Sequence, residues 1–90
     1  MKESVLQTAA MRYWKRNKIY CRKLHDTYTS GLGDALLIIK GRANFFEFKS
    51  TTGKLSKIQI WERDQVWAAG GGYFEVRTME EIKRITDSLL

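Results

Sequence analysis

Asp34, Glu47 and Lys49 are the residues whose types and spacing could support chemistry. Asp34 comes directly before an apolar run at 35–39, and Glu47 and Lys49 occupy alternate positions of a second β-favouring run at 45–49. Alternate residues of a strand point to the same face of a sheet. A chain reversal at Gly41 would place the start of the first run beside the end of the second. We therefore expect these three side chains to converge.

Two carboxylates and a strand carbonyl would form a hard, all-oxygen site, which suits Mg²⁺ or Mn²⁺. A divalent ion held there would activate water and neutralise charge on a phosphate, while Lys49 could orient or deprotonate the water. The alternative is a turn carboxylate at Asp34 and an ordinary ion pair between Glu47 and Lys49. A second Glu-x-Lys triplet, Glu81 to Lys83, falls on a predicted amphipathic helix and is interpreted as solvent-facing.

The apolar pattern predicts seven elements in the order α-β-β-β-α-β-α. The first helix runs from Lys2 to about Asn17, and the next strands occupy 19–24, 35–39 and 45–49, with turn residues at 40–44. Two capping boxes, Ser56 with Gln59 and Thr78 with Glu81, predict the starts of the other helices. Three glycines at 70–72 end the middle helix before a strand at 73–77. The simplest architecture is an α/β sandwich with one mixed sheet.

The 90 residues suffice for one domain, which we place at 1–90. The single Cys21 excludes an internal disulfide and favours a reducing compartment. No apolar run is long enough for a signal peptide or a membrane span, so a soluble intracellular protein is expected. A core of this size is marginal, and self-association is the expected remedy.

Positive charge is concentrated at the start of the chain. The net charge is +6, and residues 1–24 hold seven Lys and Arg residues against one Glu. This asymmetry favours a face that meets a polyanion, although a solvated basic helix explains the charge equally well. The candidate DNA contacts are Arg12, Lys15, Arg16 and Lys18, with Lys54 and Lys57 near the N-terminus of the middle helix.

Four other residues could have functional roles, but a structural role is the favoured interpretation for each. His25 precedes the Asp34 loop and could act near the site, although a loop histidine is more often structural. Trp14, Trp61 and Trp67 could stack on unpaired bases. At helical spacing they are more often packed in a core or a dimer interface.

Three segments resemble the virus-type replication-repair nuclease (VRR-NUC) domain, a branch of the PD-(D/E)xK superfamily. They are residues 31–38 (GLGDALLI), 46–49 (FEFK) and 52–59 (TGKLSKIQ), and the resemblance covers nearly the whole chain. It implies a restriction-endonuclease-like core. It also implies that Asp34, Glu47, Lys49 and Gln59 are catalytic, and that Asp34, Glu47, the Phe48 carbonyl and Glu3 bind metal. Gly33 departs from the family pattern, where proline often precedes the aspartate.

The resemblance implies a Mg²⁺- or Mn²⁺-dependent endodeoxyribonuclease that hydrolyses phosphodiester bonds. Standalone members resemble Holliday-junction resolvases, so branched DNA and a homodimer are expected. The alternatives are a flap or nicking nuclease with little structural preference, and a catalytically silent nucleic-acid-binding module. A cytoplasmic location is expected, and it is compatible with a phage-encoded protein acting in a bacterial host.

Overall fold

The computed structural model describes residues 2–24 and 31–90 and has the predicted order of elements. Residues 25–30, and with them His25, lie outside the described residues. None of the described helices is long and apolar enough to cross a membrane. The elements are α1 (Glu3–Arg16), β1 (Tyr20–Lys23), β2 (Ala35–Ile39), β3 (Arg42–Phe48), α2 (Lys57–Ala68), β4 (Gly72–Val76) and α3 (Met79–Leu89).

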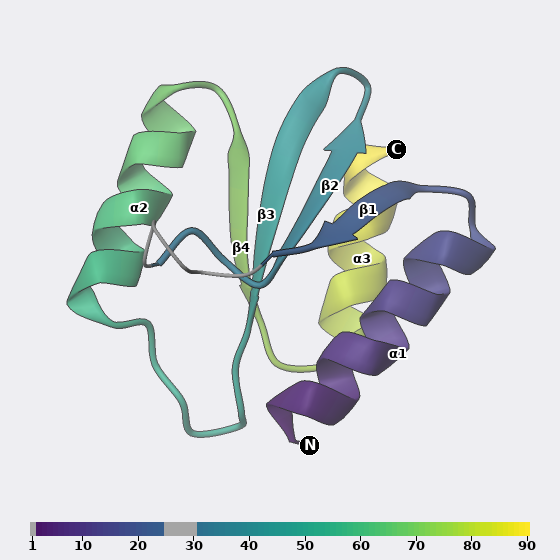
Figure 1. Cartoon of the computed structure of the whole chain (residues 1–90), viewed down its shortest axis with the longest axis horizontal. Coiled ribbons are helices and arrows are strands. Elements are labelled where there is room, and N and C mark those ends of the chain that lie inside the picture. Colours follow the sequence, from purple (N-terminus) through teal and green to yellow (C-terminus); the bar gives the residue numbers. More distant parts are fainter. Residues whose placement is uncertain (1, 25–30) are drawn as a thin grey trace.

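The four strands form one mixed sheet in the order β1-β2-β3-β4 (Figure 1). The pairs β1/β2 and β2/β3 are antiparallel, whereas β3 and β4 are parallel. Helices α1 and α3 lie on one side of the sheet and α2 lies on the other. The predicted mixed sheet with flanking helices is therefore confirmed.

The turn between β2 and β3 is shorter than the composition of residues 40–44 predicts. Lys40 and Gly41 both have positive φ, at 54° and 76°. Two such residues make the tight hairpin turn whose twist matches that of the flanking strands. As a result β3 already begins at Arg42, and Asn44 is fully buried within the strand.

The hydrophobic core lies between the sheet and helices α1 and α3. Trp14 is at its centre, fully buried, with its ring centroid 4.9 Å from that of Phe46. Its indole Nε1 donates a 3.0 Å hydrogen bond to Thr86 Oγ1 on α3, so the buried polar atom is satisfied. This bond and the ring contact fix α1 and α3 against β3.

Helix α2 covers the opposite side of the sheet only in part, because it packs along β4 and has no fully buried residue. Trp61 and Trp67 are 58% and 52% exposed. Of the three tryptophans, only Trp14 is therefore a core residue, and for Trp61 and Trp67 the other expected role, packing in a dimer interface, stays a prediction. Tyr20 and Ile38 of β1 and β2 are also exposed.

Candidate active site

Asp34 is held at the start of β2 by contacts with β3. Its backbone N–H donates a 2.8 Å hydrogen bond to the Phe46 carbonyl. Its side chain accepts a 2.9 Å hydrogen bond, at Oδ2, from the backbone N–H of Phe48. The hairpin thus places the Asp34 carboxylate beside the C-terminal end of β3, as the sequence predicts.

Glu47 and Lys49 lie on the face of the sheet opposite the core. Phe46 and Phe48 are buried in the core, so the alternation of the strand directs Glu47 to the other side. Glu47 is nevertheless only 6% exposed. Lys49 Nζ lies 3.5 Å from Glu47 Oε1, so the ion pair considered as an alternative is present within the cluster.

The two carboxyl groups interact directly. Asp34 and Glu47 lie within side-chain hydrogen-bonding reach of one another. Burial, followed by repulsion from Asp34, raises the pKa of Glu47 to about 7, against the partial offset of Lys49. Burial is also the largest cause of the raised pKa of Asp34. A bound cation would stabilise the buried Glu47 and the half-buried Asp34 as carboxylates.

Gln59 links the first turn of α2 to this pair. Its side-chain Nε2 donates a 2.7 Å hydrogen bond to Glu47 Oε1. Its Oε1 accepts a 2.8 Å hydrogen bond from the backbone N–H of Ser56, completing the predicted capping box. One side chain therefore both caps the helix and fixes the orientation of the carboxylate.

The resemblance implies two further metal ligands, the Phe48 carbonyl in β3 and the Glu3 side chain in α1. The backbone N–H of Phe48 donates to the Asp34 side chain. Because the N–H and C=O of one strand residue point toward the same neighbouring strand, the Phe48 carbonyl also points toward Asp34. Glu3 is exposed in the first turn of α1 and is close enough to raise the pKa of Asp34. Over the described ranges, no three His, Cys, Asp or Glu residues cluster tightly enough to hold a metal. A cation here would therefore rely on Asp34, Glu47 and the strand carbonyl.

The glycines before Asp34 allow close packing of backbone against backbone. Gly31 has φ +84°, and a Cβ there would lie 2.9 Å from the Ile58 carbonyl oxygen in α2. Its own carbonyl accepts a 2.8 Å hydrogen bond from the Tyr73 hydroxyl. Gly31 therefore lets the loop pack against α2, which positions both Asp34 and Gln59.

The predicted basic contacts fall in two regions. Arg12, Lys15 and Arg16 are exposed on α1, and Lys18 is exposed just after it. Lys54 and Lys57 are exposed in the segment that leads into α2. This segment and the N-terminal end of α1 both lie at the lower end of the sheet in Figure 1, the end at which β3 stops. Arg12, Lys15, Arg16 and Lys18, however, lie in the C-terminal half of α1 and just after it, away from that end of the sheet, so only Lys54 and Lys57 are on the side of the carboxylate pair.

Glu75 and Arg77 join this face without having been identified from the sequence. The parallel register pairs Glu47 with Glu75, and the Lys49 N–H donates to the Val76 carbonyl. Arg77 donates a 2.7 Å hydrogen bond to Glu75 and another to the Gly53 carbonyl. The signal was a Glu-x-Arg triplet in the next strand, which repeats the spacing of Glu47 and Lys49.

Structural comparison finds the same fold in solved proteins. One structure, described as a VRR_NUC domain, superposes with a TM-score of 0.81 and 24% sequence identity, covering 94% of each chain. A second, described as a VRR_NUC domain protein, has a TM-score of 0.86 and 15% identity, covering 100% of this chain and 88% of the other. No family model and no curated protein sequence matches the chain.

Proposed function

The chain has the VRR-NUC fold, and we propose that it is a divalent-metal-dependent nuclease of the PD-(D/E)xK type that hydrolyses phosphodiester bonds in DNA. The observation that carries the proposal is the meeting of Asp34, Glu47 and Lys49 at the junction of β2 and β3. Fold alone does not determine activity, and it is this set of side chains that gives the fold a reaction.

Asp34 and Glu47 are the proposed ligands of a Mg²⁺ or Mn²⁺ ion, together with the Phe48 carbonyl and with Glu3 from α1. Both carboxyl groups are already oriented by hydrogen bonds, Asp34 from the Phe48 N–H and Glu47 from Gln59. When bound, the ion would supply Lewis-acid activation of water and of the scissile phosphate. The protein supplies fixed oxygen ligands and a water-poor setting around Glu47.

Lys49 is the proposed contact to the reacting phosphate. Its ammonium group lies next to Glu47 and its side chain is 14% exposed, so it can reach a bound phosphate without leaving the site. There it would neutralise charge that develops on the phosphate oxygens and would orient or deprotonate the attacking water. Gln59 contacts Glu47 and is the proposed positioning residue of the site, although the family resemblance implied a catalytic role.

The basic residues are the proposed contacts to the DNA backbone. The chain carries a net charge of +6, and phosphate neutralisation by lysine and arginine supplies most sequence-independent affinity. The residues proposed for this role are all exposed: Arg12, Lys15, Arg16 and Lys18 on and just after α1, and Lys54 and Lys57 before α2 and at its start.

A homodimer acting on branched DNA is the finer form of the proposal. The side of the sheet that carries α2 exposes Tyr20, Ile38 and Trp61, each by more than 40%. Apolar groups of this size on a small domain favour burial against a second copy. A two-fold dimer would present two cleavage centres to a symmetric four-way junction.

A cleavage assay with labelled four-way junction, flap and linear duplex, each with Mn²⁺ or with a chelator, tests the proposal. We expect metal-dependent cleavage, highest on the junction, and a loss of at least about a hundredfold in Lys49→Ala. Lys83→Ala, from the second Glu-x-Lys triplet, is the matched control and should cleave normally.

The other outcomes identify the alternatives. Equal cleavage of flap and junction would favour a nuclease with little structural preference. Binding of DNA without cleavage in any metal would favour a silent binding module. Cleavage that continues unchanged in Lys49→Ala would contradict the assigned centre.

A further inference from the structure

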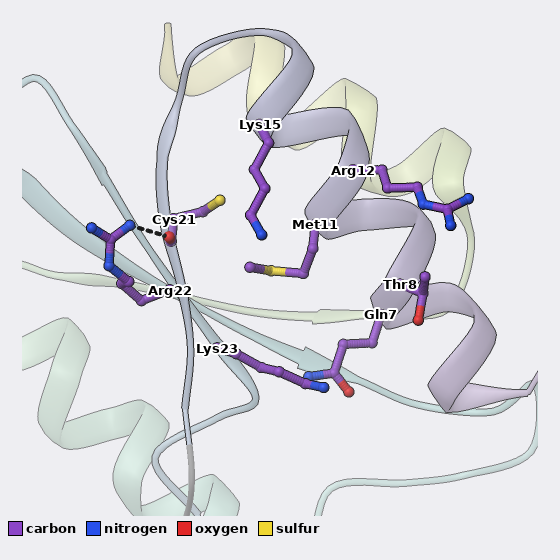
Figure 2. A pocket seen from close by; sticks show the side chains of 8 residues that line it. All are labelled: Gln7, Thr8, Met11, Arg12, Lys15, Cys21, Arg22 and Lys23. Atoms are coloured by element: carbon purple, nitrogen blue, oxygen red, sulfur yellow. Dashed lines mark hydrogen bonds between the residues drawn. The ribbon is translucent and has the colours of Figure 1, made fainter.

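A cavity of about 360 Å³ lies between α1 and the edge strand β1, outside the carboxylate cluster (Figure 2). Met11 and Cys21 form its apolar wall, and Gln7, Lys15 and Lys23 line its rim. Its volume falls within the range of small-molecule sites, about 300 to 1,000 Å³. The candidate active site does not use Gln7, Met11, Cys21 or Lys23.

The cavity is lined by apolar side chains on one part and by polar or positively charged side chains on the other. The Cys21 side chain is 3% exposed, and burial raises the pKa of its thiol, so it is neutral and serves as an apolar surface. Met11 points from α1 toward it. Lys15 and Lys23 reach the same space from the helix and the strand, and Gln7 lines it as well (Figure 2). The Arg22 guanidinium turns away to the Cys21 carbonyl, 2.8 Å from its Nη1.

The cavity lies on the α1 side of the sheet, whereas Glu47 and Lys49 lie on the opposite face, and two elements connect the cavity with Asp34. Lys23 pairs with Ala35 in the β1/β2 register, and the next N–H, that of Leu24, donates a 2.9 Å hydrogen bond to the Asp34 carbonyl. Neighbouring strands are about 4.8 Å apart. On the helix, Gln7 lies one turn after Glu3, which is close enough to affect Asp34.

We propose that this cavity holds a nucleotide of the bound DNA that has left the helical stack. Lys15 and Lys23 bind its phosphate, Met11 and Cys21 contact its base, and Gln7 hydrogen-bonds to the base edge. A base inside a continuous duplex does not reach such a cavity, whereas unstacking costs least where pairing is already interrupted. The cavity would therefore favour DNA with unpaired nucleotides. This inference rests on the proposed DNA-cleaving function and names the substrate feature that the protein recognises.

The test measures binding by fluorescence anisotropy in chelator, so no cleavage is needed. The three probes are a perfect duplex, the same duplex with a one-nucleotide bulge, and that duplex with an abasic bulge. We expect the bulged duplex to bind about fivefold or more tightly than the perfect duplex, and the abasic bulge to lose that preference. Lys23→Ala and Gln7→Ala should reduce the preference to about twofold or less. Arg84→Ala, which removes one exposed positive charge from α3, should keep it.

Equal affinity for the bulged and perfect duplexes would overturn the proposal, as would a full preference in both Lys23→Ala and Gln7→Ala. A preference that survives the abasic bulge would show that the bend of the DNA is recognised, which also contradicts it. Because the readout is metal-free binding, an active nuclease can fail this test and a chain without nuclease activity can pass it. Circular dichroism of each variant checks that the fold is kept.

Discussion

Gln59 Nε2 donates a 2.7 Å hydrogen bond to Glu47 Oε1, while the other end of the same amide caps α2. The position of a carboxylate in the candidate site is thereby tied to the start of a helix. Hydrogen bonds to metal-binding side chains hold those side chains in place, and the loss of such a bond typically lowers metal affinity or activity by about 10- to 100-fold. The effect of removing Gln59 is therefore distinct from that of removing a ligand.

Gln59→Ala is expected to reduce cleavage by about 10- to 100-fold and to weaken Mn²⁺ binding, without abolishing either. It also removes half of the capping box, which costs about 1 kcal/mol of stability. Titration calorimetry with Mn²⁺ and the junction assay measure the two effects. Gln65→Ala, an exposed position in the same helix, is the control. An unchanged Mn²⁺ affinity in Gln59→Ala would remove its positioning role.

The raised pKa of Glu47 predicts how the stability of the metal-free protein depends on pH. In the unfolded chain this group has its ordinary pKa of 4.5, whereas in the folded protein the pKa is about 7. Between these values the folded state holds more protons, so the free energy of unfolding falls as pH rises and the full penalty applies above pH 7.

Glu47→Gln should therefore stabilise the metal-free protein at pH 8, on the order of 1 to 2 kcal/mol, and have little effect at pH 4. Urea denaturation in chelator at both pH values measures the difference. Glu62→Gln, which removes one carboxylate from α2, is the control. Equal effects of Glu47→Gln at pH 4 and pH 8 would contradict the burial argument. Added Mn²⁺ should reverse the order of stability at pH 8, because the wild-type carboxylates bind it and the amide binds it poorly.

Gly31→Ala and Gly41→Ala separate two effects of replacing glycine by alanine, which are backbone strain and a clash with a neighbouring element. Both glycines have positive φ, but a Cβ at Gly41 meets nothing within 4 Å, whereas at Gly31 it lies 2.9 Å from the Ile58 carbonyl oxygen. Gly41→Ala should cost about 1 kcal/mol from backbone strain. Gly31→Ala should cost at least about 3 kcal/mol and should also lower activity, because α2 and Gln59 must move. Equal losses in urea denaturation would show that the contact with α2 contributes nothing.

Arg77 is expected to hold the segment between β3 and α2 in place. It donates to the Gly53 carbonyl and to Glu75, so Arg77→Ala releases the segment that carries Lys54. We expect faster hydrogen exchange over residues 50–55 and an increase in KM for DNA with a smaller change in kcat. Arg84→Ala removes the same charge elsewhere and should change neither. A large loss of kcat with unchanged exchange would instead indicate that Arg77 contacts the reacting phosphate.

The local features of the fold were accessible from the sequence. Both capping boxes lie within four consecutive residues, so Ser56 and Thr78 could be assigned as helix starts without knowledge of the tertiary structure. The meeting of Asp34 with Glu47 follows from one hairpin, whose two strands are adjacent in sequence. Strand alternation then predicted which side chains share a face.

Features that depend on distant parts of the chain were not accessible. The parallel pairing of β3 with β4 brings Glu75 and Arg77 to the site across a whole helix, and no local pattern specifies that register. Helix α2 has apolar residues around its circumference, so periodicity could not show that Trp61 and Trp67 stay exposed. Which strands pair, and how much of the sheet a helix covers, depend on the assembled tertiary structure.

The exposed apolar side of the sheet predicts the oligomeric state. Ile38 and Tyr20 are paired neighbours on β2 and β1, they point away from the core, and they are 43% and 47% exposed. If a second copy covers them, light scattering at micromolar concentration should give about twice the 10.5 kDa of one chain. Ile38→Glu should then give a monomer, because an unpaired carboxylate would be buried in the interface. Val5→Glu, an equally exposed position on α1, is the control and should stay dimeric. The oligomeric state also affects activity.

The monomeric variant should retain nicking of linear duplex and lose paired cuts across a junction. A wild-type chain that is monomeric at these concentrations, or an Ile38→Glu variant that remains dimeric, would exclude this face as the interface.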